Sequence, residues 1–249
     1  MEAVAIRLEN VSFGYHGSQV LREINFSVQK GEHIGIVGTS GCGKSTLLKL
    51  ISGLYRVQQG KLMVEGETEA DQIRTRVSVV MQNPGLFPAT VRENISCGHE
   101  MSEDKIHSAC EAARLMEWLK TRPEGLDTFV GERGLGVSGG QAQRIAIARA
   151  IVKDAPIIVL DEATAFSDPE NEYLIQKAFE KLIQNKTVVM IAHRLSTIRN
   201  ADQILVMEKG CLIESGTHDE LLKKDGKYAQ MWSSYTESIN WKIGTGKAV

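Results

Sequence analysis

Residues 38–46 read Gly38-Thr39-Ser40-Gly41-Cys42-Gly43-Lys44-Ser45-Thr46 and fit the pattern G-x-x-x-x-G-K-[ST]. The apolar residues 33–37 just before this run predict a short buried strand. Residues 44–52 just after it predict a helix, which Gly53 ends. A strand, a glycine-rich turn and a helix in this order form the setting in which the pattern binds phosphate groups.

This turn is predicted to bind a nucleoside phosphate along its whole length, residues 38–46. Glycines at three positions let the backbone bend so that successive N–H groups face one ligand. The N-terminus of the following helix adds a partial positive charge. Lys44 supplies a charge for the β- and γ-phosphates, and the Ser45 hydroxyl is expected to bind Mg²⁺.

The composition limits the class of protein. The chain has 249 residues, of which 42% are hydrophobic, so a domain with a sizeable core is expected. The net charge of −2 gives no general reason to bind nucleic acid, and no nucleic-acid partner is expected. Four cysteines without C-x-x-C spacing argue against a zinc site or a disulfide framework and suit a reducing cytosol.

Apolar runs in the sequence are short, and none approaches the roughly 20 residues that span a bilayer. Residues 1–7 do not have the pattern of a signal peptide. We therefore expect another domain or another chain to supply the membrane span if the protein works at a membrane.

Strand and helix patterns alternate along most of the chain, which predicts an α/β fold with a mostly parallel sheet. Two extended segments at 4–13 and 20–28 predict an N-terminal antiparallel β-subdomain. Residues 87–152 have helical spacing and few strand formers, so they predict an inserted α-helical subdomain. Within this single predicted domain, the core subdomain covers about 1–86 and 153–226, and C-terminal helices cover about 227–249.

The apolar segment 157–160 predicts a strand that is followed by two acids, Asp161 and Glu162. Active sites of open α/β sheets lie at the carboxyl ends of the strands, so Asp161 is expected near Ser45, where it would hold Mg²⁺ through water. Glu162 is one residue further on and points elsewhere, which suits a general base that polarises an attacking water.

A second glycine-rich turn, Val137-Ser138-Gly139-Gly140-Gln141, leads into the helical pattern at 141–152. Its backbone N–H groups and the Ser138 hydroxyl would form another anion site at a helix N-terminus. Taken alone, this turn is a weak signal for function, because Ser-Gly-Gly is an ordinary entry into a helix.

Together these motifs resemble the nucleotide-binding domain of ATP-binding cassette (ABC) transporters, and the resemblance covers nearly the whole chain. It implies a P-loop NTPase core that binds ATP and Mg²⁺ and hydrolyses ATP to drive transport. The residues that carry it, in the order and spacing typical of the family, are Gly38–Ser45, Gln82, Val137–Gln141, Ile157–Glu162, Asp168 and His193.

The resemblance implies roles for single residues. Tyr15 resembles the aromatic residue that stacks on adenine. Gln82 resembles the residue that senses Mg²⁺ and the attacking water, and His193 resembles the switch histidine that contacts the γ-phosphate. Glu162, Gln82 and His193 would then form the catalytic set. Asp168 resembles the acid that connects the two sites of a dimer, and it also fits an N-cap for the helix that follows it.

In this family the turn at 137–141 faces the ATP held by a partner domain, so the resemblance implies a head-to-tail homo- or heterodimer. Residues 90–95 and 129–134 are typical of exporter-type cassettes, whose transmembrane domain lies in the same or another chain. The surface around 83–87 and Glu132 would dock on that domain at the cytoplasmic face of the membrane. Simple packing of the apolar residues within the loop is the alternative.

Two other classes of protein share parts of this pattern. A non-transport ABC-class ATPase, active in DNA repair or on ribosomes, usually carries a long coiled-coil insertion or a second cassette, and this sequence has neither. A P-loop kinase has no need of the turn at 138–140. The guanine-reading motif Asn-Lys-x-Asp of GTPases is missing, because Val188 stands at its last position.

Overall fold

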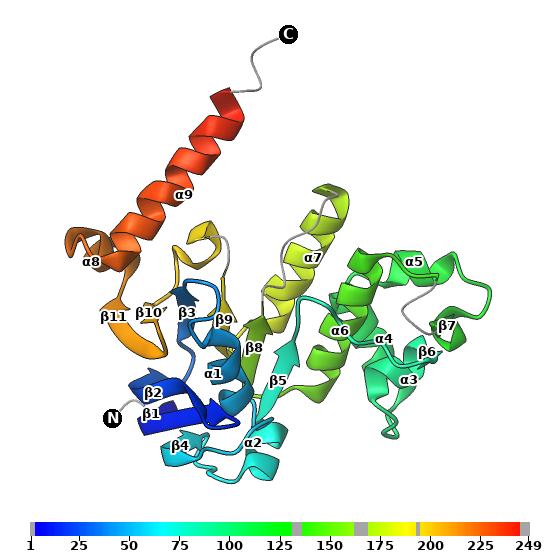
Figure 1. Ribbon diagram of the computed structural model, residues 1–249. Helices are drawn as coiled ribbons and strands as arrows, with labels where there is room; N and C mark the ends of the chain where they lie inside the picture. Colours follow the sequence, from blue (N-terminus) through cyan, green and yellow to red (C-terminus); the bar gives the residue numbers. More distant parts are fainter. Residues whose placement is uncertain (1–2, 131–135, 162–168, 193–194, 245–249) are drawn as a thin grey trace. The chain divides into compact units, whose positions relative to one another are not determined.

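The computed structural model describes residues 3–130, 136–161, 169–192 and 195–244 (Figure 1). The chain forms two compact units, one of residues 1–73 with 188–249 and one of residues 74–187. The sequence predicted a different division of the chain, into a core subdomain, a helical insert and C-terminal helices. That division stays a prediction.

The first unit begins with an antiparallel sheet of strand order β2-β1-β4. β1 (Val4–Tyr15) and β2 (Ser18–Gln29) form a hairpin, and β4 (Gln59–Val64) pairs along the other edge of β1. His16 and Gly17 in the hairpin turn have φ angles of 47° and 83°, which match the twist of the flanking strands. The predicted antiparallel β-subdomain is confirmed.

A second group of strands in this unit is built around β3 (His33–Gly38). β9 (Thr187–Ile191) and β10 (Gln203–Glu208) lie parallel to β3 on either side, and β11 (Cys211–Gly216) returns antiparallel beside β10. The runs of Val, Ile and Leu in β3, β9 and β10 are buried, as expected for parallel strands. α1 (Lys44–Ile51) contacts both β2 and β3.

The C-terminal part of this unit contains η3 (Leu195–Ile198), α8 (His218–Lys223) and α9 (Lys227–Gly244). Tyr228 of α9 is fully buried in a core with Val37 and Ile198, and further aromatic residues of α9 pack against this core. The sequence predicted C-terminal helices over about 227–249. α9 continues to Gly244 because no glycine or proline interrupts the chain before that point.

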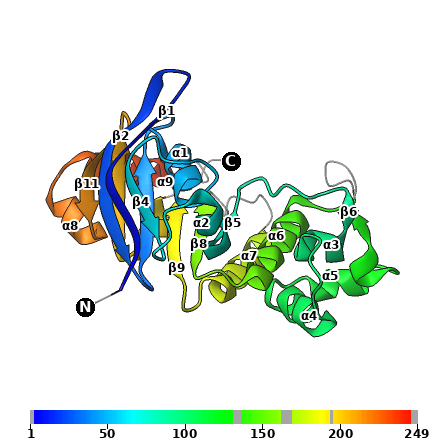
Figure 2. The same ribbon diagram turned by 90° about the horizontal axis from the view of Figure 1, so that it is seen from below.

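In the second unit, β5 (Val77–Val80) and β8 (Ile157–Asp161) pair in parallel. α6 (Gly139–Lys153) is the central helix and contacts β5, α3 (Val91–Ser96), α4 (Glu103–Ala112) and α7 (Pro169–Leu182). Figure 2 shows α6 and α7 side by side. The remaining elements are α5 (Met116–Lys120), η1 (Gly125–Asp127) and the strand pair β6 (Ala89–Thr90) and β7 (Phe129–Val130).

The sequence pattern missed two features of the fold. β6 and β7 have two residues each, too few to show an alternating pattern. α2 (Ala70–Arg76) buries only Ala70 and Ile73, so its apolar face is too narrow to be recognised. Within the described residues, no helix has the length and apolar character needed to cross a membrane.

Candidate nucleotide-binding site

The loop between β3 and α1 has the backbone geometry of a phosphate-binding turn. Gly38, Gly41 and Gly43 have φ angles of 152°, 75° and 107°, a region that strongly favours glycine. A Cβ atom on Gly38 would also overlap the carbonyl oxygen of Met207 in β10. Gly43 is the N-cap residue of α1 and offers no side-chain cap, which leaves the first amides of the helix for an anion.

Lys44 lies across this loop. Its Nζ atom donates hydrogen bonds to the carbonyl oxygens of Gly38 at 2.8 Å and Thr39 at 2.9 Å. The Cys42 Sγ atom lies 3.8 Å from the same nitrogen. Lys44 is buried, and the carbonyl groups of the loop itself stabilise its charge.

The other residues of the loop divide by exposure. Cys42 and Thr46 are buried and contribute to packing. Ser45 is exposed in the first turn of α1, where its hydroxyl can reach a ligand, and Thr39 and Ser40 are exposed as well. The structure therefore gathers all nine predicted residues, 38–46, around one turn.

Tyr15 lies at the end of β1, directly before the hairpin turn. Its hydroxyl oxygen is 3.4 Å from Thr46 Oγ1, which connects the predicted adenine-stacking residue with the first turn of α1. The ring of Tyr15 is half-buried, and it packs edge-on against Phe13 and Tyr55. An aromatic ring and a phosphate-binding turn thus lie next to each other in the same unit.

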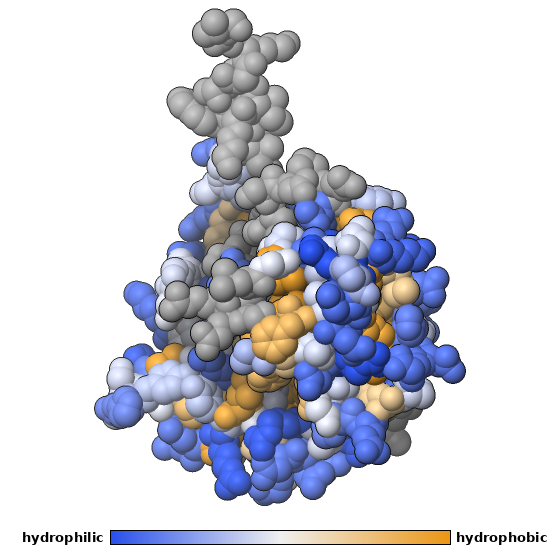
Figure 3. Space-filling view, turned by 90° about the vertical axis from the view of Figure 1, so that its right-hand side faces the viewer, coloured by the Kyte–Doolittle hydropathy of each residue, from blue (hydrophilic) through white to orange (hydrophobic). Residues whose placement is uncertain are grey.

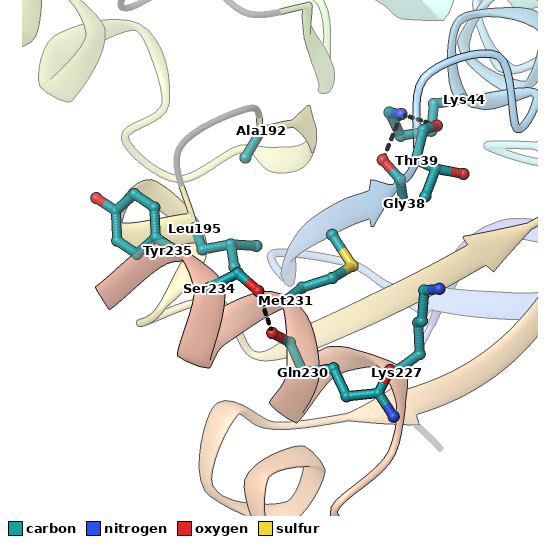
Figure 4. Close-up of a pocket in the computed structure, with 10 residues that line it drawn as sticks. All are labelled: Gly38, Thr39, Lys44, Ala192, Leu195, Lys227, Gln230, Met231, Ser234 and Tyr235. Carbon is teal, nitrogen blue, oxygen red and sulfur yellow. Dashed lines mark hydrogen bonds between the residues drawn. The ribbon is translucent and has the colours of Figure 1, made fainter. Parts of the chain in front are cut away.

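A cavity of about 490 Å³ opens beside the loop (Figure 4). Gly38, Thr39 and Lys44 line one side of it, and α9 lines the other. The sequence patterns gave no sign that the C-terminal helix reaches this site, because only the packing of α9 on the core brings it there. The residues that α9 and the segment after β9 contribute are Ala192, Leu195, Lys227, Gln230, Met231, Ser234 and Tyr235.

In the second unit, two predicted site residues lie at the same edge of a sheet. β5 and β8 are parallel, and Val80 pairs with Leu160 at their carboxyl ends. Asp161 is the last residue of β8, and exposed Gln82 follows β5 by two residues. The two residues therefore lie at neighbouring strand ends, and the roles near Mg²⁺ that were predicted for them stay predictions.

The turn at 137–141 is the capped N-terminus of α6. The Gln141 N–H donates to Ser138 Oγ at 3.2 Å, and the Ser138 N–H donates to Gln141 Oε1 at 2.8 Å. This reciprocal capping box starts the helix at Gly139, two residues earlier than the sequence predicted. Val137 is half-buried, whereas the Ser138 side chain is exposed and keeps its hydroxyl proton for a ligand.

The two glycines of this turn differ in the space that a side chain would find at each position. A Cβ atom on Gly140 would meet the Asn171 side chain of α7 at 2.9 Å, so packing within the chain requires a glycine there. A Cβ atom on Gly139 would meet no described atom within 4 Å. The described part of the chain therefore gives no packing reason for glycine at position 139.

α6 also carries residues that the sequence patterns did not identify. Gln143 is fully buried, and its Nε2 atom donates to the Met81 carbonyl oxygen at 3.2 Å. Six residues later, Arg149 donates to the carbonyl oxygen of Gly85 at 3.1 Å. These side chains hold the backbone on both sides of Gln82, so α6 links the turn at its own N-terminus to the Gln82 loop.

Four predicted residues lie outside the described part of the structure: Glu132, Glu162, Asp168 and His193. Their predicted roles stay predictions. Glu162 follows Asp161 directly in the sequence, and His193 follows β9 by two residues.

A sequence model of the ABC transporter family matches residues 21–165, a range that includes the glycine-rich loop, the capped turn of α6 and Asp161. The chain belongs to the ABC transporter family. The predicted family and the predicted class of protein, an ABC transporter ATPase domain that binds ATP, are confirmed.

The relatives of this ABC domain are longer proteins. The ATP-dependent lipid A-core flippase of Vibrio vulnificus (strain YJ016) is 44% identical over 234 residues, which cover 91% of this chain and 40% of the flippase. The putative multidrug export ATP-binding/permease protein YgaD of Bacillus subtilis (strain 168) is 43% identical over 235 residues, which cover 92% of this chain and 40% of YgaD. The chain thus spans about 40% of the length of the curated relatives that it matches.

A solved structure agrees with these relatives. The bacterial Atm1-family ABC exporter with ATP bound matches this ABC domain with a TM-score of 0.84 and 38% sequence identity. The match covers 94% of this chain and 42% of the exporter chain. The predicted α/β P-loop fold and the exporter-type branch are confirmed.

Proposed function

We propose that this chain is the ATP-hydrolysing motor domain of a membrane ABC exporter, and that ATP joins two such domains head to tail to drive translocation of a substrate. One observation carries the proposal: each unit presents a helix N-terminus suited to phosphate, that of α1 after Gly43 and that of α6 after Ser138. The first would bind the chain's own ATP, and the second would face the ATP of a partner domain.

Gly139 supports the proposal that this turn faces the ATP of a partner domain. Its backbone offers open space where a side chain would stand, beside the exposed hydroxyl of Ser138. Close approach of a phosphate from another molecule accounts for a glycine that the chain's own described packing does not require. The turn Val137–Gln141 is then a contact to the second nucleotide-binding domain, in a homo- or heterodimer.

Mg²⁺ fits the oxygen donors that the chain provides. The Ser45 hydroxyl and the Asp161 carboxylate would hold the ion, Asp161 through water, and Gln82 would contact it through its amide oxygen. Bound Mg²⁺ neutralises charge that develops on the β- and γ-phosphates. Lys44 would exchange its bonds to Gly38 and Thr39 for phosphate oxygens.

The remaining roles follow from the family. Glu162 would accept the proton of the attacking water, Gln82 would orient that water, and His193 would contact the γ-phosphate. Asp168 would connect the two sites of the dimer. Hydrolysis then weakens the dimer, because ADP and phosphate make fewer contacts across it than ATP does.

An exposed aromatic surface in the second unit fits the partner membrane domain. Phe87 is 55% exposed and Phe129 is 62% exposed, and β6 beside Phe87 pairs with β7, which contains Phe129. Figure 3 faces the side that carries these strands in Figure 1 and shows orange side chains among hydrophilic ones. Exposed aromatic groups of this kind mark interaction surfaces, and we assign this one to cytoplasmic helices of a transmembrane domain in the same or another chain.

The decisive test is Glu162→Gln. We expect turnover of ATP to fall on the order of 10²-fold or more, because the general base is lost, while ATP binding is retained. With hydrolysis blocked, size-exclusion chromatography with Mg-ATP should show a dimer that is missing without nucleotide.

Two further variants sharpen this test. Glu100→Gln removes an exposed carboxylate of the same unit and should behave like the wild type. Ser138→Ala combined with Glu162→Gln should abolish the ATP-dependent dimer. A monomer that persists with Glu162→Gln at high protein concentration would overturn the proposal.

A further inference from the structure

The side-chain amide of Gln58 lies against the backbone of Gly14, the residue before Tyr15. The Gly14 N–H donates to Gln58 Oε1 at 2.9 Å, and Gln58 Nε2 donates to the Gly14 carbonyl oxygen at 3.0 Å. The two residues are 44 positions apart in the sequence, so only the folded chain brings them together. Both polar atoms of the glutamine amide are used by one backbone residue.

This pair of hydrogen bonds continues the ladder between β1 and β4. Backbone pairing of these strands ends where Ser12 meets Gln59. On the other edge of β1, Gly14 pairs with Gln19 of β2. Because a glutamine side chain carries the same donor and acceptor as a peptide group, Gln58 supplies one further rung beyond the last backbone pair of β4.

Aromatic packing from the same segment supports the same end of the hairpin. Tyr55, three residues before Gln58, stacks on Phe13 with ring centroids 5.5 Å apart. Tyr55 also meets the ring of Tyr15 at 5.7 Å and 77°, and Phe13 meets it at 5.1 Å and 84°. Edge-to-face contacts of this geometry favour one orientation of a ring.

The position of Tyr15 makes such support necessary. It is the last residue of β1, and the turn that follows it is exposed. Its hydroxyl contact to Thr46 is 3.4 Å long, so that contact restrains the ring weakly. A ring that is ordered before binding spares the entropic cost of immobilising a side chain on association.

We propose that Gln58 is a positioning residue for the base of ATP: through Gly14 it holds the ring of Tyr15 in the orientation that stacks on a purine, with Tyr55 as packing support. This inference rests on the proposed function, which assigns Tyr15 to adenine. Both hydrogen bonds of Gln58 go to Gly14 and none to the phosphate-binding loop. Its effect is therefore confined to the part of the affinity that depends on the base.

The test compares a ligand that has a base with one that has none. In the 249-residue chain carrying Gln58→Ala, titration calorimetry should show Mg-ATP binding weakened about five- to tenfold, the effect of losing one or two hydrogen bonds. Binding of Mg-tripolyphosphate, which has no base, should stay within about twofold of wild type. In steady-state kinetics KM for ATP should rise while kcat is unchanged.

Gln59→Ala is the matched control, because Gln59 is the exposed neighbouring glutamine at the start of β4. It should bind both ligands like the wild type. Gln58→Glu should resemble Gln58→Ala, since a carboxylate cannot donate to the Gly14 carbonyl oxygen. Equal weakening of both ligands by Gln58→Ala, or a fall in kcat without a rise in KM, would overturn the inference.

Tyr15→Ala separates this inference from the proposed function. If Tyr15→Ala weakens ATP and leaves tripolyphosphate unchanged, whereas Gln58→Ala changes neither ligand, then Tyr15 stacks on the base and Gln58 does not position it. If Tyr15→Ala also leaves ATP binding unchanged, the stacking role of Tyr15 is wrong and the inference falls with it. If the wild-type chain binds no ATP, the proposed function itself is wrong.

Discussion

The guanidinium group of Arg149 lies against the ring of Phe87, with 5.2 Å between the guanidinium carbon and the ring centroid. The same group donates to the carbonyl oxygens of Asn94 at 2.8 Å and Gly85 at 3.1 Å. Asn94 is fully buried and hydrogen-bonds both the N–H and the carbonyl oxygen of Phe87. One arginine of α6 thus fixes the loop that follows Gln82 and the aromatic ring that this loop presents.

Arg149→Lys should lower the free energy of unfolding by about 2–3 kcal/mol, measured by urea denaturation. A lysine ammonium group cannot replace the planar fork that reaches Asn94 and Gly85 together. Phe87→Leu is the matched control, because it keeps every hydrogen bond of Arg149 and loses only the ring contact, about 0.5–1 kcal/mol. If the two variants were equally destabilised, the hydrogen bonds of Arg149 would not be the main contribution.

Ser138→Ala should cost about 1 kcal/mol of stability through the lost capping box, and it should also remove ATP-dependent dimerisation. Thr217→Ala provides a comparison, since Thr217 and Glu220 form the same capping box at the start of α8. Thermal unfolding should show a similar loss for both variants. When each is combined with Glu162→Gln to block hydrolysis, size-exclusion chromatography with Mg-ATP should show a defect only for Ser138→Ala. A matching dimerisation defect for Thr217→Ala would reduce the role of Ser138 to helix capping.

Lys44→Met should abolish the thermal stabilisation that Mg-ATP gives the wild type. A ligand at 100 times its Kd stabilises a protein by about 2.7 kcal/mol, which differential scanning fluorimetry detects as a clear rise in Tm. Without ligand the variant should lose only about 1 kcal/mol, because the Gly38 and Thr39 carbonyl oxygens lose one donor each. Lys61→Met, at an exposed position of β4, should keep the full response to ATP.

Stability should fall between neutral pH and mildly acidic pH because of His218. Burial lowers the pKa of His218 from its ordinary value of 6.5, and the charge of Arg199 lowers it further, while Asp219 opposes this shift. The ring also meets the Tyr228 hydroxyl at 2.8 Å and the Trp232 ring at 4.4 Å. On acidification the unfolded chain binds a proton before the folded chain does. The contribution of neutral His218 to the free energy of unfolding is therefore complete above pH 6.5. It is lost as the pH falls through that value toward the lower pKa of the folded chain.

Urea denaturation at about pH 7.5 and about pH 5.5 measures this loss. His218→Gln should be less stable than the wild type at the higher pH and should lose less on acidification. His107→Gln changes an exposed histidine of α4 and should leave the pH dependence as it is in the wild type. A wild-type stability that stays constant over this range would contradict the role of His218.

Local patterns predicted most of the elements and the residues that bear on phosphate chemistry. The run 38–46 was recognised because its glycines, lysine and serine must stand at fixed spacing on one turn. Asp161 was placed correctly at the end of a strand, since the buried apolar run before it is typical of a parallel strand, whereas Gln82 was named only from the family resemblance. By contrast, Gln143 and Arg149 looked like ordinary polar positions of a helix. Their roles depend on which carbonyl oxygens lie opposite them in the folded unit.

The sequence alone was enough to establish the class of fold, the phosphate-binding loop and the family, because each depends on residues close together in the chain whose spacing has one physical use. Tertiary structure alone brought Gln58 to Gly14, Tyr55 to Tyr15 and α9 to the side of the loop. These contacts join residues far apart in the sequence, and their partners are backbone atoms, which every residue type offers, or ring edges, which every aromatic residue offers. No pattern of residue types along the chain encodes them, so only the packed fold shows which side chains surround the phosphate-binding loop and the predicted adenine-stacking residue Tyr15.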